Sequence, residues 1–329
     1  MKHNYHYPVS LILGLIFLST TSFGQFVNFE ETWQEFLSNN KISNTSELTR
    51  PSKEDKVDYL KYSLMYANSN FCQSRVGEAA EFMNEIDRIG EETYKTIPRF
   101  KEKHDDLDAK IDAYHKIENM WKRFLRTKSM SLDDLAAVEA AKQSCEKGTL
   151  AKYFHMIAHQ NLCEGNVLEA KSNFEGRVLK LAEKTSLKVS DIEGLEEEVA
   201  KMKSYFQGLP KLGKAWKSYT STGVSNGFDI ALPVYECYPI PNMKEYVLRG
   251  AADICGQGAA MLKKIKQLMV SNSHELDATL AEKINWLESE VEKNEETVSV
   301  LNAAWKEFLP TDEIQGEKKY GYEYCGKEP

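Results

Sequence analysis

Residues 145–163 read CEKGTLAKYFHMIAHQNLC, a stretch with helical character that carries a cysteine at each end. Cys237 and Cys255 repeat the same interval of 18 residues, and Cys72 and Cys325 stand alone on either side. If residues 149–163 form one helix, its ends lie roughly 20 Å apart. Bonded cysteines need Cα atoms within about 7 Å of each other. The two cysteines of this stretch are therefore expected to bond to partners elsewhere in the chain.

Pairing the second cysteine of each block with the first cysteine of the next uses all six residues. The predicted disulfides are Cys72–Cys145, Cys163–Cys237 and Cys255–Cys325, with separations of 73, 74 and 70 residues. Closing a loop of this size stabilises a fold by roughly 4–5 kcal/mol in the chain-entropy description. The nearly constant loop predicts three copies of one disulfide-closed unit. The alternative is a mixture of free thiols and one or two bonds of another pattern.

The tryptophans give a second repeat signal. A tryptophan followed three residues later by an aromatic residue occurs at Trp33, Trp121, Trp216 and Trp305, at intervals of 88, 95 and 89 residues. A fixed period of this size is typical of repeat architectures. We expect these tryptophans to be core residues that seal the end of each long helix against the next hairpin.

Apolar residues in alternating steps of three and four precede these tryptophans, which predicts long amphipathic helices. The last stripe, which only Asn294 interrupts, consists of Leu280, Ile284, Leu287, Val291, Val298, Leu301, Trp305 and Phe308. The helix that carries it should run about 30 residues and end near Leu309, because Pro310 cannot continue a helix. The corresponding middle helix contains Gly208 and Pro210, where we expect a kink or a break.

Shorter helical hairpins are predicted around Cys72, Cys163 and Cys255. The clearest hairpin has Phe154, Ile157 and Ala158 on its first helix, Gly165 in the turn, and Ala170 and Phe174 on its second helix. This pattern resembles the tetratricopeptide repeat, and the resemblance implies paired helices that bind peptides or proteins. The first copy has Ser74 in place of the glycine, and the third has Gly250 at the small site with Leu262 in place of the second alanine.

These patterns together predict an all-α fold, an elongated array of three helical repeat units with long heptad-patterned helices and disulfides between hairpins. We expect residues 1–24 to be a signal peptide and residues 25–50 an N-terminal cap helix. The three repeat units are expected at residues 51–147, 148–239 and 240–329.

The predicted signal peptide has an apolar core at residues 9–18 and small residues near Gly24, and the mature chain should begin near Gln25. An even number of cysteines agrees with export to an oxidising compartment, periplasmic or secreted. The formal net charge of −8 argues against nucleic acid or anionic membrane surfaces as partners. No stretch of the mature chain predicts a membrane span.

Few residues suggest reaction chemistry. His155 and His159 stand one helical turn apart and could share a metal, although Met156 occupies the position where a metalloprotease would need glutamate. Gly256 and Gly258 look like a phosphate-binding loop, but the hairpin context predicts a helix–helix turn instead. The run Glu196–Glu198 is expected to be a solvated helix face. We expect no catalytic residue, no cofactor and no bound metal.

Tyrosines gather near two of the cysteines and form a candidate ligand surface. They are Tyr235, Tyr238, Tyr320, Tyr322 and Tyr324. Such rings either stack on a glycan or small molecule, or pack against the disulfides and helix ends. The favoured function is a non-catalytic interaction or scaffold protein with a protein partner. The alternatives are a cell-envelope hydrolase with unrecognised carboxylates, and binding of a glycan or small ligand on the tyrosine surface.

Overall fold

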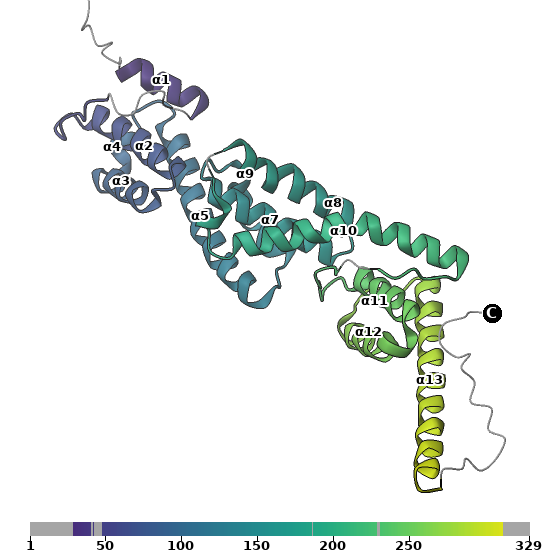
Figure 1. Ribbon diagram of the computed structural model, residues 1–329. Coiled ribbons are helices and arrows are strands. Elements are labelled where there is room, and N and C mark those ends of the chain that lie inside the picture. The colour runs from purple at the N-terminus through teal and green to yellow at the C-terminus, as the bar shows by residue number, and fades with distance from the viewer. Residues whose placement is uncertain (1–28, 41, 43–47, 186, 229–230, 312–329) are drawn as a thin grey trace, which may run out of the picture. The chain divides into compact units, whose positions relative to one another are not determined.

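The computed structural model describes residues 29–40, 42, 48–185, 187–228 and 231–311 (Figure 1). These residues form α-helices with short 3-10 and π-helical segments, and no β-strand occurs among them. The prediction of an all-α fold is therefore confirmed. The expected signal peptide, Cys325 and the tyrosines at 320, 322 and 324 lie outside the described residues. In the described part, no helix combines the length and the apolar character that crossing a membrane requires.

The chain divides into two compact units. The N-terminal unit comprises residues 1–116 and 140–147, and the C-terminal unit comprises residues 117–139 and 148–329. The division into a cap and three repeat units stays a prediction, because a partition into compact units does not address internal repetition.

The N-terminal unit contains a helical hairpin, α2 and α3, packed with α1, α4 and the first part of α5. The bounds are α1 (Phe29–Asn39), α2 (Lys56–Cys72), α3 (Val76–Ile89), α4 (Glu91–Tyr94) and α5 (Phe100–Thr127). Asp55 caps the N-terminus of helix α2, and its side chain accepts a hydrogen bond from the backbone N–H of Asp58 at 3.3 Å. Trp33 of α1 is buried and stacks on Phe100 with 6.0 Å between ring centroids. The core of this unit is therefore built around aromatic side chains.

The division between the units falls inside α5, η3 and α7, and most later elements belong to the C-terminal unit. From α5 onward the elements are α6 (Leu132–Ala136), η3 (Glu139–Gln143), α7 (Lys147–Cys163), α8 (Val167–Asn173), η4 (Phe174–Leu179), α9 (Lys180–Lys184), η5 (Val189–Asp191), α10 (Leu195–Thr222), α11 (Ile240–Ala252), η6 (Ile254–Gly258), α12 (Ala259–Ser271) and α13 (Ala278–Thr311). Gly256 and Gly258 lie in η6, a π-helical segment that connects α11 to α12 at the place where the sequence predicted a helix–helix turn.

The hairpin turns require a left-handed backbone. Gly165, between α7 and α8, has φ of +78°. Ser74, at the corresponding place between α2 and α3, has φ of +64° although it carries a side chain. Gly250 of α11 serves a different purpose, because a Cβ there would lie 2.9 Å from Leu287 of α13. Its small size allows these two helices to approach closely.

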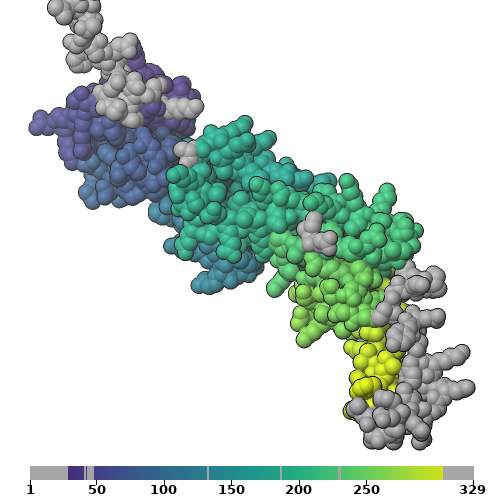
Figure 2. All heavy atoms as spheres, viewed as in Figure 1, coloured from purple at the N-terminus to yellow at the C-terminus, as the bar shows by residue number. Residues whose placement is uncertain are grey.

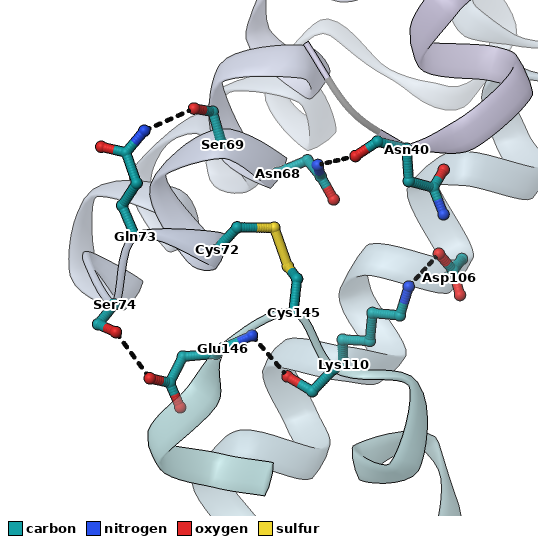
Figure 3. Close-up of a disulfide and its surroundings, with 11 residues drawn as sticks. Asn40, Asn68, Ser69, Cys72, Gln73, Ser74, Asp106, Lys110, Cys145 and Glu146 are labelled. Carbon is teal, nitrogen blue, oxygen red and sulfur yellow. Dashed lines mark hydrogen bonds and ion pairs between the residues drawn. A yellow bond between two sulfur atoms is a disulfide. The ribbon is translucent and has the colours of Figure 1, made fainter. Parts of the chain in front are cut away.

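Two disulfides join pairs of described residues, and they are two of the three predicted pairings. Cys72–Cys145 joins the end of α2 to the residues before α7 (Figure 3), and Cys163–Cys237 joins the end of α7 to the residues before α11. The Cα atoms are 4.8 Å apart in each. Beside the first disulfide, Ser74 Oγ donates a hydrogen bond to the Glu146 carboxylate at 2.7 Å. The third predicted pairing includes Cys325 and lies outside the described residues.

The prolines interrupt the long helices less than expected. Helix α10 continues through Pro210 from Leu195 to Thr222, so there is no break at this position, and α13 ends at Thr311, two residues after the expected end near Leu309. A proline removes one backbone hydrogen bond, but packing on both sides can hold the helix together. In α10, Phe206 before the proline and Leu212 after it are both buried. Burial of the apolar stripe therefore outweighs the local preference of proline.

The tryptophans are not uniformly core residues. Trp33 and Trp121 are almost completely buried, as expected, and Trp121 Nε1 donates a hydrogen bond to the backbone oxygen of Glu193 at 2.8 Å. Trp216 is half-buried. Trp305 is 58% exposed, so the expectation of a core position was wrong there.

Candidate functional site

The two histidines singled out in the sequence lie in the interior of the C-terminal unit. His155 and His159 are on α7, and neither side chain is more than 3% exposed. Aromatic rings surround them because the long helices place their apolar stripes here. Trp121 and Phe124 of α5 lie within 6 Å of the His155 ring, and Phe124 lies 4.9 Å from the His159 ring. The histidines therefore belong to the core.

A buried carboxylate accompanies His155. Oε2 of Glu198, on α10, is 3.8 Å from His155 Nε2, and Lys128 Nζ donates a hydrogen bond to Oε1 of the same carboxylate at 2.5 Å. The Glu198 side chain is 4% exposed and that of Lys128 is 43% exposed. The expectation that the run Glu196–Glu198 is a solvated face was wrong for Glu198. Its charge is compensated by a lysine that reaches in from the surface.

The buried setting fixes the protonation of this cluster. Burial lowers the pKa of His155 and outweighs the opposing effect of Glu198. Burial lowers the pKa of His159 to about 3, and neighbouring His155 acts in the same direction. Burial opposes ionisation of Glu198, but His155 and the hydrogen bond from Lys128 outweigh it and lower its pKa to about 2. Both imidazoles are therefore neutral and the carboxylate is charged near neutral pH.

His159 faces the second disulfide and contributes to a geometric cluster of potential metal ligands. Its Nδ1 is 3.5 Å from Cys163 Sγ. The ligand atoms of His159, Cys163 and Cys237 lie within 4.8 Å of one another. Metal binding needs thiolates, and the Cys163–Cys237 bond consumes both sulfur atoms. The cluster as it stands therefore offers a single imidazole and no thiolate ligand.

Tyr235 packs inside the unit and does not contribute to an exposed ligand surface. Its side chain is 2% exposed, its ring lies 4.9 Å from that of Tyr205 and 5.6 Å from that of His159, and Lys201 Nζ lies 4.6 Å from its centroid. Burial raises the pKa of both tyrosine hydroxyls. Among the described residues neither hydroxyl has a hydrogen-bond partner. Of the two roles considered for these tyrosines, ligand binding and internal packing, Tyr235 therefore has the packing role.

Tyr238 is half-buried and packs against a histidine that the sequence did not single out. The His274 ring lies 5.0 Å from that of Tyr238, and its Nε2 lies 2.8 Å from the backbone oxygen of Cys163 and 3.1 Å from that of Cys237. One imidazole thus bridges the two carbonyls of the disulfide-bonded cysteines. Its role is to hold the hairpin end of α7 against the chain entering α11.

The buried cluster has no substrate-facing group in this conformation. Nδ1 and Nε2 of His155, Oε2 of Glu198 and the hydroxyl of Tyr205 are all inaccessible and lack a hydrogen-bond partner within the described chain. General acid–base catalysis needs a group within hydrogen-bonding reach of a substrate proton. We therefore assign this cluster to the interior and look for function on the surface.

The surface of the C-terminal unit has an open groove between α12 and α13, with a volume of about 510 Å³. Ala259, Leu262, Val270 and Val291 provide its apolar side chains. Charges of opposite sign line its two walls, with Lys263 and Lys266 on α12 and with Glu288, Glu292 and Glu295 on α13. The Lys266–Glu288 ion pair, at 2.5 Å, connects the walls.

Apolar exposure is concentrated on these two helices. Val270 is 91% exposed and Met269 is 44% exposed at the end of α12. Ten large apolar side chains are exposed among the described residues, and six of them lie on these two helices. Besides Met269 and Val270 on α12, the six include Val298, Val300, Leu301 and Trp305 on α13. Figure 2 shows α12 and α13 in the green and yellow part of the surface. Such a concentration is typical of a surface that binds a partner.

Sequence reasoning missed the groove, Glu198 and His274. Glu198 follows Leu195 by three residues and precedes Met202 by four, which places it on the apolar face of α10 and was a usable signal. His274 and the groove had no comparable signal, because both depend on packing between distant segments. No family model, curated protein or solved structure matches this chain.

Proposed function

We propose that this protein is an exported, non-catalytic interaction protein that binds an amphipathic helix of a partner polypeptide in the groove between α12 and α13. The observation that carries the proposal is the exposure of Val270 at the side of a groove with apolar and charged walls. Apolar side chains exposed to water have an unfavourable free energy that a partner can relieve.

The shape of the groove supports a helical partner. A helix with its side chains is about 10–12 Å across and presents apolar anchors every three or four residues. A volume of about 510 Å³ accommodates a short row of such anchors against Leu262 and Val291. The resemblance of the hairpins to tetratricopeptide repeats favours the same kind of partner.

The charges of the groove indicate the orientation of the partner. Lys263 and Lys266 on α12 would face acidic residues, whereas Glu292 and Glu295 on α13 would face basic residues. Complementary charge favours one register and one partner over others. The partner helix should therefore have an apolar stripe with acidic residues on one side and basic residues on the other.

Export is supported by the disulfides together with the pattern of residues 1–24. Two disulfides are stable in an oxidising compartment and rare in a reducing one. The mass of the protein recovered from its native source should correspond to a chain that begins at Gln25. A protein that retains residues 1–24 in the cytoplasm would contradict the proposal.

The binding proposal is tested with a matched pair of surface variants. Val270→Asp places a charge beside the groove, and Leu168→Asp changes a comparably exposed residue on α8. Immobilised wild-type protein and the Leu168→Asp variant should retain the same polypeptide from an envelope extract or medium. The helix protected from proteolysis in that complex is then synthesised, and Val270→Asp should weaken its binding at least tenfold by calorimetry.

Two results would overturn the binding proposal. One is that the synthetic helix binds the Val270→Asp variant as tightly as the wild type. The other is that nothing is retained from the extract by the wild-type protein. Thermal unfolding of both variants serves as the control for folding.

A further inference from the structure

The second disulfide has a metal-ligating side chain beside it. His159 lies four residues before Cys163 on α7, so the two side chains project from the same face of the helix. His159 Nδ1 lies 3.5 Å from Cys163 Sγ, and Cys237 Sγ completes a group of three ligand atoms within 4.8 Å of one another. The described part of the chain contains no other group of three potential metal ligands this close together. The disulfide and the imidazole therefore form a distinct cluster.

The equivalent position at the first disulfide holds an amide instead of an imidazole. The residue four before Cys72 on α2 is Asn68, whose side chain donates a hydrogen bond to the backbone oxygen of Asn40 at 3.0 Å (Figure 3). The two disulfides otherwise resemble each other, because all four cysteines are half-buried and the Cα atoms are 4.8 Å apart in each. The first disulfide is thus an internal control for the second.

The spacing of the ligand atoms suits a tetrahedral zinc ion. A Zn–S bond of about 2.3 Å and a Zn–N bond of about 2.1 Å, at the tetrahedral angle, place sulfur and nitrogen roughly 3.6 Å apart. The distance between His159 Nδ1 and Cys163 Sγ is already 3.5 Å. Two thiolates on one zinc ion lie roughly 3.8 Å apart. Opening the disulfide frees the two sulfur atoms to separate to this distance by side-chain rotation.

Contacts that do not involve sulfur hold the cluster together. His274 Nε2 lies 2.8 Å from the backbone oxygen of Cys163 and 3.1 Å from that of Cys237, so one imidazole bridges both cysteine backbones. The His159 ring packs between Phe124 and Tyr235, at centroid distances of 4.9 and 5.6 Å. These contacts would keep the imidazole and the two cysteines adjacent after the sulfur–sulfur bond is broken.

We propose that opening of the Cys163–Cys237 disulfide converts this cluster into a zinc site, with His159, Cys163 and Cys237 as protein ligands and a fourth position open to water. A dithiol reductant breaks the sulfur–sulfur bond, becomes a disulfide itself and leaves two protein thiols. Zn²⁺ then displaces both thiol protons and forms two Zn–S bonds and one Zn–N bond. Thiolate and imidazole are ligands that zinc prefers.

The disulfide and the metal exclude each other, because both need the same two sulfur atoms. The site exists only in the dithiol form of the protein, which precedes oxidation of the new chain or follows its reduction. It shares no residue with the groove between α12 and α13, so its failure would leave the proposed partner binding untouched.

Alkylation measured at each cysteine tests the site in the full-length chain. The protein is reduced with a dithiol, separated from the reductant without oxygen, and treated with iodoacetamide with and without one equivalent of Zn²⁺. Peptide mass spectra give the rate at each cysteine. Zn²⁺ should slow the alkylation of Cys163 and Cys237 at least tenfold, and that of Cys72 and Cys145 less than twofold.

Histidine variants identify the third ligand. His159→Asn introduces the residue that stands at the equivalent position before Cys72, and His159→Gln has a longer side chain. Each should weaken the protection of Cys163 and Cys237 by Zn²⁺ at least tenfold, so that one misfolded variant does not decide the result. His115→Gln, which alters an exposed histidine, should leave the protection unchanged. Circular dichroism of the reduced proteins is the control for folding.

Three outcomes would overturn the zinc site. One is that Zn²⁺ protects all four cysteines equally or protects none, which would leave only adventitious binding by thiols. Another is protection of Cys163 and Cys237 that the folded His159 variants retain. The third is a reduced wild-type chain that loses its helical circular dichroism and does not regain it with Zn²⁺, because a bound structural metal stabilises the folded form.

Discussion

The Nε2 atom of His155 lies 3.8 Å from Oε2 of Glu198 inside the C-terminal unit, and both side chains are almost completely buried. Glu198 remains charged because Lys128 reaches it from the surface, whereas His155 stays neutral because burial disfavours the imidazolium. An ionised carboxylate and two uncharged imidazoles thus share one interior. Their states make the stability of this unit dependent on pH.

Acidification should destabilise the protein well above the pH at which carboxylates usually titrate. The pKa of His159 is lowered from 6.5 to about 3, so the unfolded chain binds the proton first. Stability from this residue is complete above pH 6.5 and is lost as the pH falls toward 3. The loss amounts to about 2 kcal/mol between pH 6.5 and 4.5. His155 acts in the same direction.

Urea unfolding between pH 7.5 and 4.5 measures this dependence. A His159→Leu variant should show a weaker dependence than the wild type. His115→Gln, which alters an exposed histidine, should leave the dependence unchanged. A wild-type free energy of unfolding that stays constant down to pH 5 would contradict the assignment of neutral buried histidines.

Each described disulfide should contribute strongly to stability. Replacing Cys72 and Cys145 with serine should lower the free energy of unfolding by about 4 kcal/mol, because the bond closes a loop of 73 residues. The Cys163 and Cys237 pair, with a separation of 74, should give a loss of similar size. Chemical unfolding of the two double variants measures both values. Losses below 1 kcal/mol would show that the loops gain little from closure.

A side chain at the turn between α7 and α8 should be unfavourable. Gly165→Ser should cost about 1 kcal/mol, because residue 165 has φ of +78° and L-residues rarely adopt this conformation. Gly176→Ser is the matched control, since a Cβ there meets nothing within 4 Å and the backbone is helical. Thermal unfolding should separate the two variants. Equal melting temperatures would mean that the turn adapts without strain.

Removing the Tyr235 hydroxyl should not destabilise the protein. This hydroxyl is buried without a hydrogen-bond partner among the described residues, so Tyr235→Phe should change stability by less than about 0.5 kcal/mol or increase it. Tyr59→Phe should cost about 1 kcal/mol, because the buried Tyr59 hydroxyl accepts a hydrogen bond from Arg50 at 2.5 Å. Urea unfolding compares the two. A larger loss for Tyr235→Phe would point to an internal water that bonds this hydroxyl.

The cysteine spacing predicted much of the fold because it combined two independent constraints. A helix between Cys145 and Cys163 excludes a bond between them. The regular spacing of the cysteines then offers each of the two a partner 73 or 74 residues away. Helical periodicity likewise predicted α10 and α13, since the helix face on which a side chain lies depends on local spacing alone. A break at Pro210 did not occur, because the local cost of this proline is smaller than the packing gained on both sides of it.

The candidate site was less predictable, because a sequence does not show which of its charged side chains are buried. Glu198 looked like part of an exposed acidic run, and its burial depends on Lys128, which lies 70 residues earlier. The expectation for Trp305 failed for a related reason. Its pattern matches that of Trp121, but Trp121 lies in the aromatic interior of α5 and α7, whereas Trp305 lies on the part of α13 that extends past its hairpin.

The two disulfide loops also determine how the chain would respond to tension. A pulling force applied across both disulfides passes through the sulfur–sulfur bonds and bypasses the 73- and 74-residue loops. Each loop contains one long helix, α5 in the first and α10 in the second. These helices carry no load, and roughly 240 Å of chain per loop cannot be drawn out. The oxidised protein would therefore be a tether of limited extension in which α5 and α10 stay folded while it is stretched.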